Sequence, residues 1–236
     1  MTRVVIIGGG PGGYEAALVA RQLGADVTLI ERDALPESPG QRRGVPQGRH
    51  THALIAAGCQ AIERLFPGIG QALLDQGGVP ADPARDIRWF FEGGMLARAT
   101  SGMDGVMVSR PLLEATVRGR VRAIPNITIR QGSQVMALAT DTTRAQVTGV
   151  TLLTGEVLAA DLVVDATGRG SRAPQWLDAL GYAAPVEEQV EIAVSYTTRL
   201  FRRDRRALDG DVAAILPPTP HGKRGGVMLA QEGDRW

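Results

Sequence analysis

The stretch RVVIIGGGPGG, residues 3–13, decides the fold of this chain. Residues 3–7 form an apolar run of strand length that leads straight into a glycine-rich turn. A helix-like stretch, 14–23, follows, and a second strand at 26–30 ends on an acidic residue. Strand, glycine turn, helix, strand and acid in this order predict the first βαβ unit of an α/β fold with a parallel sheet.

Each glycine of the turn has its own expected role. Gly8 lets the chain turn tightly out of the strand, Gly10 lets the backbone come close to a pyrophosphate, and Gly13 allows the helix to pack on the sheet. With Gly12, they form a candidate phosphate-binding turn at the N-terminus of a helix, where unpaired N–H groups point outward. Glu31 lies 23 residues after Gly8, where a carboxylate accepts both ribose hydroxyls and repels a 2′-phosphate. The pattern favours FAD or NAD over NADP; a glycine turn without a ligand is the alternative.

Composition narrows the class of protein. At 236 residues the chain has room for one large domain or two smaller ones, and 44% hydrophobic residues are ordinary for a globular protein. A net charge of +1 gives no reason to expect nucleic acid as a partner. The one cysteine, Cys59, suits a reducing cytosol and is expected to be a packed small residue and not a nucleophile. No signal peptide and no membrane span are expected, so we predict a cytoplasmic protein.

The remaining elements are expected from periodicity and turn residues. Residues 32–49, rich in Pro, Gly and Arg, should form a long functional loop. The expected helices are 52–65, capped by Thr51, then 67–76 and 110–123. The expected strands are 86–92 and 95–100 as a hairpin, 127–131, 134–139, 146–153, 161–165 and 190–201. The basic run 202–206 is expected to be a solvated turn, with phosphate binding as the alternative.

Four stretches carry a resemblance to a known family. They are VVIIGGGPGG…VTLIERD at the start, RRGVPQGRHTHAL at 42–54, VSRPLLE at 108–114 and ADLVVDATGRGSRAPQWL at 160–177. The chain resembles the flavin-dependent monooxygenases of the aromatic-hydroxylase type, and within them the bacterial epoxidase branch that acts on polyether and polyene intermediates. The resemblance implies a Rossmann-like FAD-binding domain with a parallel sheet, followed by the start of a β-rich substrate domain. We expect residues 1–85 and 105–183 to form the first and 86–104 and 184–236 the second.

The resemblance also assigns expected roles to the first half of the site. Glu31 would bind the adenosine ribose of FAD, and Arg32 beside it is a further cofactor-binding candidate. Arg42 or Arg43 would approach the pyrophosphate or the flavin. The segment from Val45 to Gln47 would lie along the isoalloxazine edge.

In the second half, Arg110 would reach the cofactor from the start of its helix. Asp165, Thr167 and Gly168 would belong to the second FAD-contacting motif, although Thr167-Gly168 replaces the family's usual Asp-Gly there. This departure weakens the transfer of an NADPH-contacting role. Arg43 and Arg110 are the candidates for influencing the flavin, and no catalytic acid or base is nominated.

Two other groups of residues have two possible interpretations each. His50 and His52 alternate like a metal pair but lack a third ligand of suitable spacing, so we expect no metal and favour loop anchoring or a polar contact to the flavin. Trp89, Phe90 and Phe91 either line a substrate pocket or pack in a sheet.

The expected activity is insertion of one oxygen atom of O₂, by epoxidation or hydroxylation through a flavin C4a-hydroperoxide, into a small hydrophobic substrate of secondary metabolism. NAD(P)H is the expected electron donor, although the chain has one dinucleotide fingerprint only. The family pattern also implies that this chain is an N-terminal half whose C-terminal half would act as a partner. The alternatives are an inactive or partner-dependent FAD-binding fragment and a flavin-dependent reductase of the same fold.

Overall fold

The computed structural model describes all 236 residues and separates into two compact units. Unit 1 consists of residues 1–37 and 117–194, and unit 2 of residues 38–116 and 195–236. Each unit is therefore assembled from two stretches of chain. The predicted FAD-binding domain, 1–85 with 105–183, is also discontinuous, but it takes in residues 38–85 and 105–116, which belong to unit 2. The predicted domain boundaries stay a prediction.

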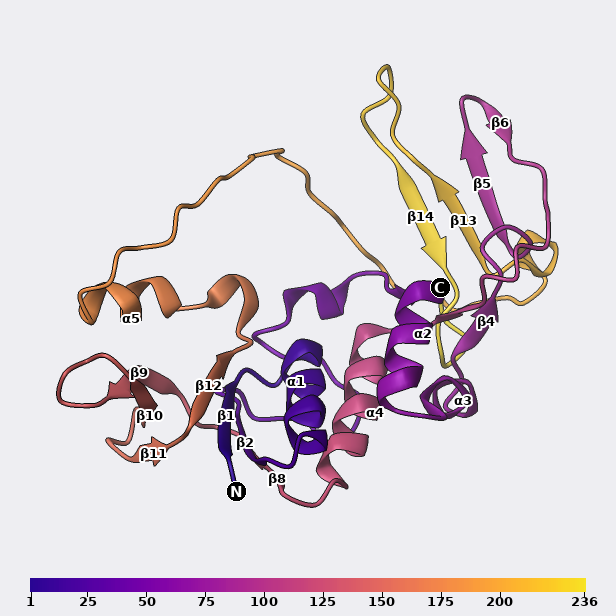
Figure 1. Cartoon of the computed structure of the whole chain (residues 1–236). Helices are drawn as coiled ribbons and strands as arrows, with labels where there is room; N and C mark the ends of the chain where they lie inside the picture. Colours follow the sequence, from indigo (N-terminus) through magenta and orange to yellow (C-terminus); the bar gives the residue numbers. More distant parts are fainter. The chain divides into compact units, whose positions relative to one another are not determined.

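A parallel sheet forms the centre of unit 1 (Figure 1). Its strands are β1 (Arg3–Ile7), β2 (Asp26–Ile30), β8 (Ile127–Arg130) and β12 (Leu162–Asp165), in the order β12-β1-β2-β8. Helix α1 (Pro11–Gln22) leaves the turn after β1 and buries Tyr14, Ala17 and Leu18. The chain first adds strands on one side of β1 and later adds β12 on the other. The order therefore reverses between β1 and β12, which is where such sheets bind ligands.

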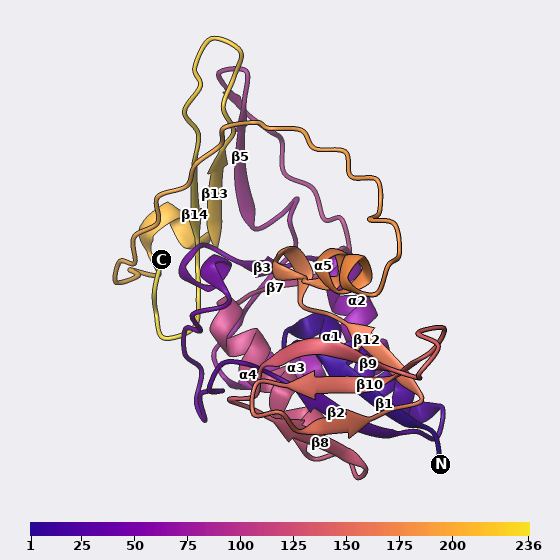
Figure 2. The same cartoon turned by 90° about the vertical axis from the view of Figure 1, so that its left-hand side faces the viewer.

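A second, antiparallel sheet packs on the first within unit 1 (Figure 2). Its strands are β9 (Val135–Thr140), β10 (Val147–Leu152) and β11 (Val157–Ala159). Val5, Ile7 and Ile30 of the parallel sheet form one buried cluster with Val150 of β10 and Trp176 of helix α5 (Ala173–Ala179). The parallel sheet thus has buried apolar side chains on both faces, as parallel sheets require.

Unit 2 contains two small sheets and two short helices. The first sheet has the order β14-β13-β5-β6, from β5 (Ile87–Phe91), β6 (Gly94–Met95), β13 (Ala213–Leu216) and β14 (Gly226–Leu229). The second has the order β3-β7-β4, from β3 (Ala53–Leu54), β4 (Val79–Ala81) and β7 (Gly105–Met107). The helices are α2 (Ala56–Leu65) and α3 (Ile69–Asp75). The single-turn 3₁₀ helices of the chain are η1 (Pro46–Arg49), η2 (Gly168–Gly170, in unit 1) and η3 (Ala207–Gly210).

Helix α4 (Arg110–Arg122) begins in unit 2 and ends in unit 1. The side chain of Ser109 caps it, since its Oγ accepts the N–H of Leu112 at 3.3 Å. Leu113 and Val117 are buried along it, which confirms the helix predicted from their spacing.

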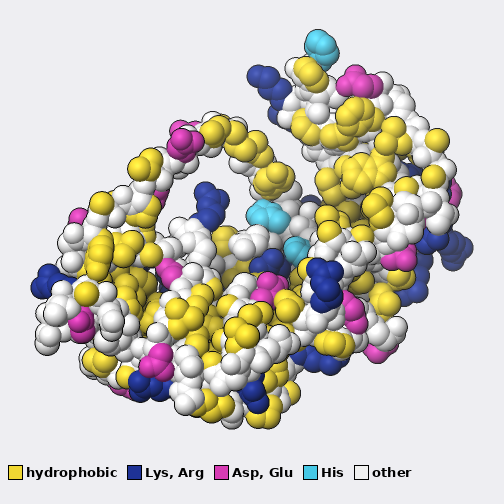
Figure 3. Space-filling model, viewed as in Figure 1, with side chains coloured by type: hydrophobic (Ala, Val, Ile, Leu, Met, Phe, Trp, Pro, Cys, Tyr) yellow, Lys and Arg dark blue, Asp and Glu magenta, His cyan; other side chains and the backbone are white.

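The β5–β6–β13–β14 sheet changes from buried to exposed along its length. Register places Ile215 opposite both Trp89 and Val227, so these side chains share one face. The inner end of this face is buried, whereas Phe91 is 57% exposed and Val227 50% exposed at the outer end. Figure 3 shows the hydrophobic side chains gathered over this sheet. Trp89 is half-buried and donates Nε1–H to the carbonyl of Pro83, so packing is the observed role of this aromatic.

The α/β fold class is confirmed, and two predicted elements are wrong. Residues 190–200 form no strand. Val190 is 85% exposed, and no other segment pairs with this stretch in a sheet. The helix predicted at 52–65 begins only at Ala56, and Thr51 does not cap it. Ala53 and Leu54 pair with β7 instead, and Ile55 keeps extended backbone, which delays the helix. The predicted hairpin at 86–100 exists, but its second strand is limited to Gly94–Met95.

No helix of the chain is long and apolar enough to cross a bilayer.

Candidate functional site

The first group of candidate cofactor-binding residues lies at the carboxyl edge of the parallel sheet in unit 1. Backbone bonds fix this edge: Gly8 N–H donates to the carbonyl of Ile30 and Ala166 N–H to that of Ile7, both at 2.8 Å. The glycine turn after β1 and the segment after β12 therefore meet at the point where the strand order reverses. A crevice at this position is where open α/β sheets bind nucleotides.

Two glycines of the turn are required by close contacts. Gly8 has φ +111°, and a Cβ there would lie 2.7 Å from the carbonyl oxygen of Ala166. A Cβ on Gly13 would lie 1.8 Å from the carbonyl oxygen of Gly8, so α1 starts in direct contact with the turn. By contrast, a Cβ on Gly10 or Gly12 would meet nothing within 4 Å. The turn is thus closed toward the protein and open at Gly10 and Gly12, the positions predicted for a pyrophosphate.

Glu31 is buried beside this turn. Its Oε2 accepts the N–H of Gly9 and its Oε1 accepts that of Asp33, both at 2.9 Å. These bonds orient the carboxylate at the end of β2, next to the phosphate-binding turn. Arg32 points away, with a side chain 63% exposed and its Nε 3.9 Å from an Asp33 carboxylate oxygen.

Asp165 organises the segment after β12. Its Oδ1 accepts the N–H and the hydroxyl of Thr167, at 2.9 and 2.5 Å, and its Oδ2 accepts the hydroxyl of Ser171 at 2.6 Å. Gly168 begins η2 with φ +66° and has open space at its Cβ position. Asp165 therefore shapes the turn, while the backbone at Thr167 and Gly168 faces the crevice edge beside Gly8. The structure does not test the predicted contacts of these residues with a cofactor.

A separate group of candidate residues lies in unit 2 and centres on Glu114. Its Oε2 accepts from Nη1 of Arg42 at 3.2 Å and its Oε1 accepts from Nε of Arg110 at 2.8 Å. The side chains of Arg42 and Glu114 are only 4% and 5% exposed. One buried carboxylate therefore holds two guanidinium groups. Glu114 is a residue that the sequence reasoning missed, although its position four residues after Arg110 was a signal.

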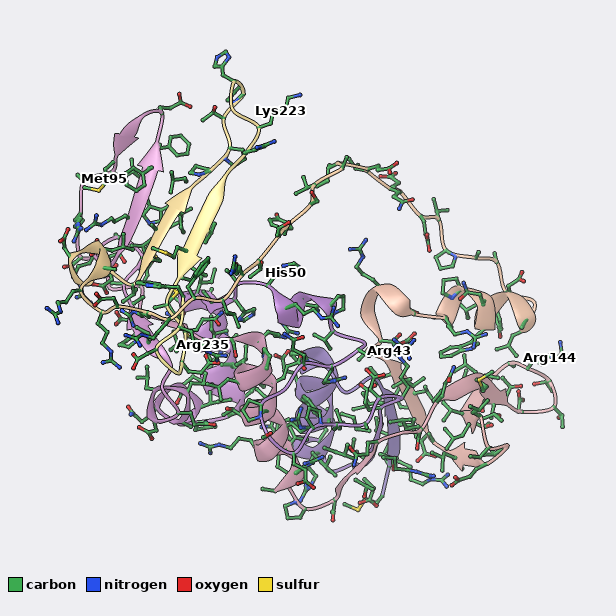
Figure 4. The ribbon with its side chains drawn as sticks, turned by 180° about the vertical axis from the view of Figure 1, so that it is seen from behind. Arg43, His50, Met95, Arg144, Lys223 and Arg235 are labelled. Atoms are coloured by element: carbon green, nitrogen blue, oxygen red, sulfur yellow. The ribbon has the colours of Figure 1, made fainter.

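The other predicted residues of the 42–54 motif lie around η1. Arg43 and Gln47 are exposed and Val45 is buried, with Arg43 on the irregular stretch before η1 (Figure 4). The segments on either side of them line a pocket of about 190 Å³ within unit 2. Its polar lining includes Gln41, Arg49, His50, Thr198, Gln231 and Arg235. Figure 4 labels His50 and Arg235 on this part of the unit. Of these, the sequence reasoning weighed only His50.

The two histidines of the motif have different surroundings. His50 Nδ1 lies 2.9 Å from the hydroxyl of Thr198, which anchors the loop end. Burial lowers the pKa of His52, and the positive charge of Arg110 lowers it further, against the raising effects of a backbone bond to Val108 and of the Glu114 charge. His52 is thus neutral near pH 7. No group of three or more His, Cys, Asp or Glu side chains is arranged to hold a metal ion.

These residues fit a bound FAD. The open side of the glycine turn offers the close backbone approach that a pyrophosphate needs, and the N-terminus of α1, with Gly10 as its cap, adds a partial positive charge. Glu31 is fixed where a ribose-binding carboxylate is expected. In unit 2 the Arg42–Glu114–Arg110 cluster supplies positive charge suited to an anionic cofactor.

Fold and site define a flavin enzyme, and comparison with known proteins agrees. Residues 3–175 match the family of FAD-dependent oxidoreductases, and the chain belongs to this family.

Relatives and neighbouring structures share this framework. The chain is 34% identical over 250 residues to Protein Rv3254 of Mycobacterium tuberculosis, covering 98% of this chain and 51% of that protein. It therefore spans about half the length of this relative. It is 38% identical over 107 residues to dihydrolipoyl dehydrogenase 2 of Haloarcula marismortui, a match that covers 44% of this chain and 20% of that protein.

Among solved structures, PqsL of Pseudomonas aeruginosa, described as a probable FAD-dependent monooxygenase, has the same fold with a TM-score of 0.71 at 17% identity. That likeness covers 99% of this chain and 58% of PqsL. The 2-methyl-3-hydroxypyridine-5-carboxylic acid oxygenase has a TM-score of 0.56 at 27% identity, covering 75% of this chain and 42% of that one.

Proposed function

We propose that the protein is an FAD-dependent monooxygenase that inserts one oxygen atom of O₂ into a small hydrophobic molecule by epoxidation or hydroxylation. The observation that carries the proposal is the junction at the carboxyl ends of β1 and β12, where the glycine turn, Glu31 and residues 165–168 meet. Family membership supports FAD as the cofactor, and the likeness to an oxygenase at 27% identity supports the reaction class.

The proposed reaction needs two electrons from outside the protein. NAD(P)H would supply a hydride and solvent a proton; one oxygen atom of O₂ enters the substrate and the other leaves as water. FAD, when bound, supplies the redox chemistry that activates O₂. The chain's own residues would bind and orient it. The turn at Gly8–Gly13 would hold the pyrophosphate and Glu31 the ribose. We propose that Arg43 and Arg110 place positive charge near the flavin, with Arg110 fixed by Glu114.

Substituting Gly10 separates cofactor binding from folding. Gly10 has φ −92° and a Cβ there meets nothing in the protein, so Gly10→Ala should fold normally. A pyrophosphate packed against this position would clash with the added methyl group. We expect the FAD dissociation constant, measured by quenching of flavin fluorescence, to rise at least about tenfold.

The matched control is Gly119→Ala in α4, where a Cβ also meets nothing within 4 Å. It should leave the affinity for FAD unchanged. Equal FAD affinity in both variants would refute the proposed position of the pyrophosphate.

The reaction itself is tested by ¹⁸O₂ labelling. The FAD-loaded protein is mixed with NADH or NADPH and with polyene and phenolic compounds, and products are analysed by mass spectrometry. One ¹⁸O atom per product molecule would support the monooxygenase. Oxidation of NAD(P)H with product formation in the absence of O₂ would support the reductase alternative. FAD binding without turnover of any kind would support the fragment alternative.

A further inference from the structure

A second pocket of unit 2 has no role in the proposed function. It has a volume of about 360 Å³ and lies beside β4, lined by the stretch 77–80 and by Arg203, Arg205, Gln231, Gly233 and Asp234. This volume is at the lower end of the range of small-molecule sites, roughly 300–1,000 Å³. Val79 and Pro80 form an apolar wall, and Arg203 and Arg205 face it with positive charge.

Two contacts hold Arg203 in place, and neither of them uses a side-chain N–H group as a hydrogen-bond donor. Its main-chain N–H donates to the carbonyl of Asp234 at 2.7 Å, and its guanidinium carbon lies 4.8 Å from the centroid of the Trp236 ring. Stacking on an aromatic face fixes the plane of a guanidinium and leaves its N–H edge available. Its Nε is buried and has no hydrogen-bond partner. Buried donors are almost always paired, so this unpaired N–H is a hydrogen-bond donor of Arg203 that the protein itself does not use.

The charges around the pocket do not balance. The Asp234 carboxylate is taken by Arg205, which donates to its Oδ1 from Nε at 2.8 Å and pairs with the same oxygen through Nη2 at 2.7 Å. The nearby Glu232 is already bound to Arg235 at 2.7 Å and to the N–H of Ser109 at 3.0 Å. Burial lowers the pKa of Arg203, and the charge of Arg205 lowers it further, against the smaller opposing effect of Asp234. The pocket is therefore short of one negative charge.

We propose that this pocket binds the oxyanion group, a carboxylate or a phosphate, of a small metabolite, with Arg203 as the principal donor and Arg205 as the second. The planar guanidinium matches two oxygens of such a group, and the apolar wall at Val79 and Pro80 suits a hydrocarbon portion next to it. The N–H groups of Gly77 and Gly78 are engaged with the carbonyls of Leu74 and Leu73, so the arginine side chains supply the recognition. The basic run 202–206 was expected to be a solvated turn, and the proposed site corresponds to its alternative, phosphate binding.

The test is calorimetric titration of the protein with inorganic phosphate and, separately, with benzoate, at constant ionic strength in chloride. Each titration is run on flavin-free and FAD-saturated protein, so that it stands apart from cofactor binding. Saturable binding of at least one probe is expected, and the probe that binds more tightly identifies the source of the oxyanion. Absence of saturation by both probes up to about 10 mM, an affinity of roughly −3 kcal/mol, would overturn the proposal.

Variants locate the site. Arg203→Gln should weaken binding at least tenfold, and Arg205→Gln, whose side chain is 75% exposed and dispensable for folding, should weaken it at least threefold. Arg224→Gln is the matched control, since it removes an exposed arginine of the same unit and should leave binding unchanged. If Arg203→Gln does not fold, the Arg205 variant alone decides. Equal affinity in the Arg205 and Arg224 variants would then count against the pocket.

Discussion

The contact between Gly13 and Gly8 is the tightest constraint on a single residue in unit 1. A Cβ at Gly13 would stand 1.8 Å from the carbonyl oxygen of Gly8, which is backbone and cannot rotate away. We expect Gly13→Ala to lower the free energy of unfolding by about 1–3 kcal/mol, as overpacking typically does, and so to lower the melting temperature. We also expect it to abolish FAD binding. Thermal unfolding monitored by circular dichroism measures the first and flavin fluorescence the second. Gly119→Ala should be neutral or stabilising, because it adds a good helix former at an open position.

His52 should make stability depend on pH. Its pKa in the folded protein is lowered, chiefly by burial, from the ordinary value of about 6.5. Below about pH 6.5 the unfolded chain therefore takes up a proton that the folded protein resists, and stability falls as the pH falls. We expect His52→Gln to flatten the decrease in melting temperature between about pH 7 and 5.

The control for this effect is His221→Gln, because His221 is exposed. It should keep the pH dependence of the unchanged protein. A His52 variant with the same slope would show that other groups determine it.

At this scale, the conformation of the glycine turn and the position of Glu31 were predictable because both follow from local geometry. Gly8 needs a positive φ, and Glu31 ends the strand adjacent to the turn. Arg42 was not: its burial against Glu114 depends on a helix 72 residues further along the chain. Sequence spacing carries no signal for such a contact.

Among the elements, α4 depends on its first turn for more than helix formation. Glu114 links Arg110 of the same turn to Arg42 of the loop before η1, and the Arg42 and Glu114 side chains are almost fully buried. Removing the carboxylate leaves Arg42 buried without its ion-pair partner. We expect Glu114→Ala to lower the free energy of unfolding by about 3–5 kcal/mol, measured by urea denaturation.

The comparison variant is Glu156→Ala, which breaks a pair with Arg130 whose side chains are 45% and 33% exposed. Its effect should stay below about 1 kcal/mol. Similar losses in the two variants would contradict a special role for Glu114.

Most strands were predictable from their own residues, including β8 and β12, whose partners are distant in sequence, but several strands of unit 2 were not. The β9–β10 pair was expected from its polar turn, and it is observed with antiparallel register. Strands β13 and β14 were not expected, because β13 takes its parallel partner β5 from more than 120 residues earlier. The opposite error occurred at 190–201, where alternation alone predicted a strand; within this range only Phe201 pairs, exchanging backbone hydrogen bonds with Trp236.

For the molecule as a whole, the outer end of the β5–β13–β14 face determines its surface behaviour. Phe91 and Val227 expose apolar area next to half-buried Trp89 and Ile215. Contiguous apolar patches bind hydrophobic dyes and promote association. We expect the double substitution Phe91→Ser and Val227→Ser to reduce the fluorescence of bound anilinonaphthalene sulfonate at least about twofold and to leave FAD affinity unchanged.

A matched pair of changes away from this face, Leu153→Ser and Val157→Ser, removes exposed apolar side chains of unit 1. A comparable fall in dye fluorescence with that pair would mean that the sheet face is not the principal apolar surface.

The interleaving of the two units has a consequence for the newly made protein. Val4 of β1 pairs with Leu162 of β12, 158 residues later along the chain. At translation rates of about 5–20 residues per second, one edge of the central strand therefore waits roughly 8–30 s on the ribosome for its neighbour. During that interval an apolar strand presents unpaired N–H and carbonyl groups to other chains. The β1–β12 junction of the proposed cofactor site thus closes late in synthesis, and the nascent chain is exposed to aggregation until it does.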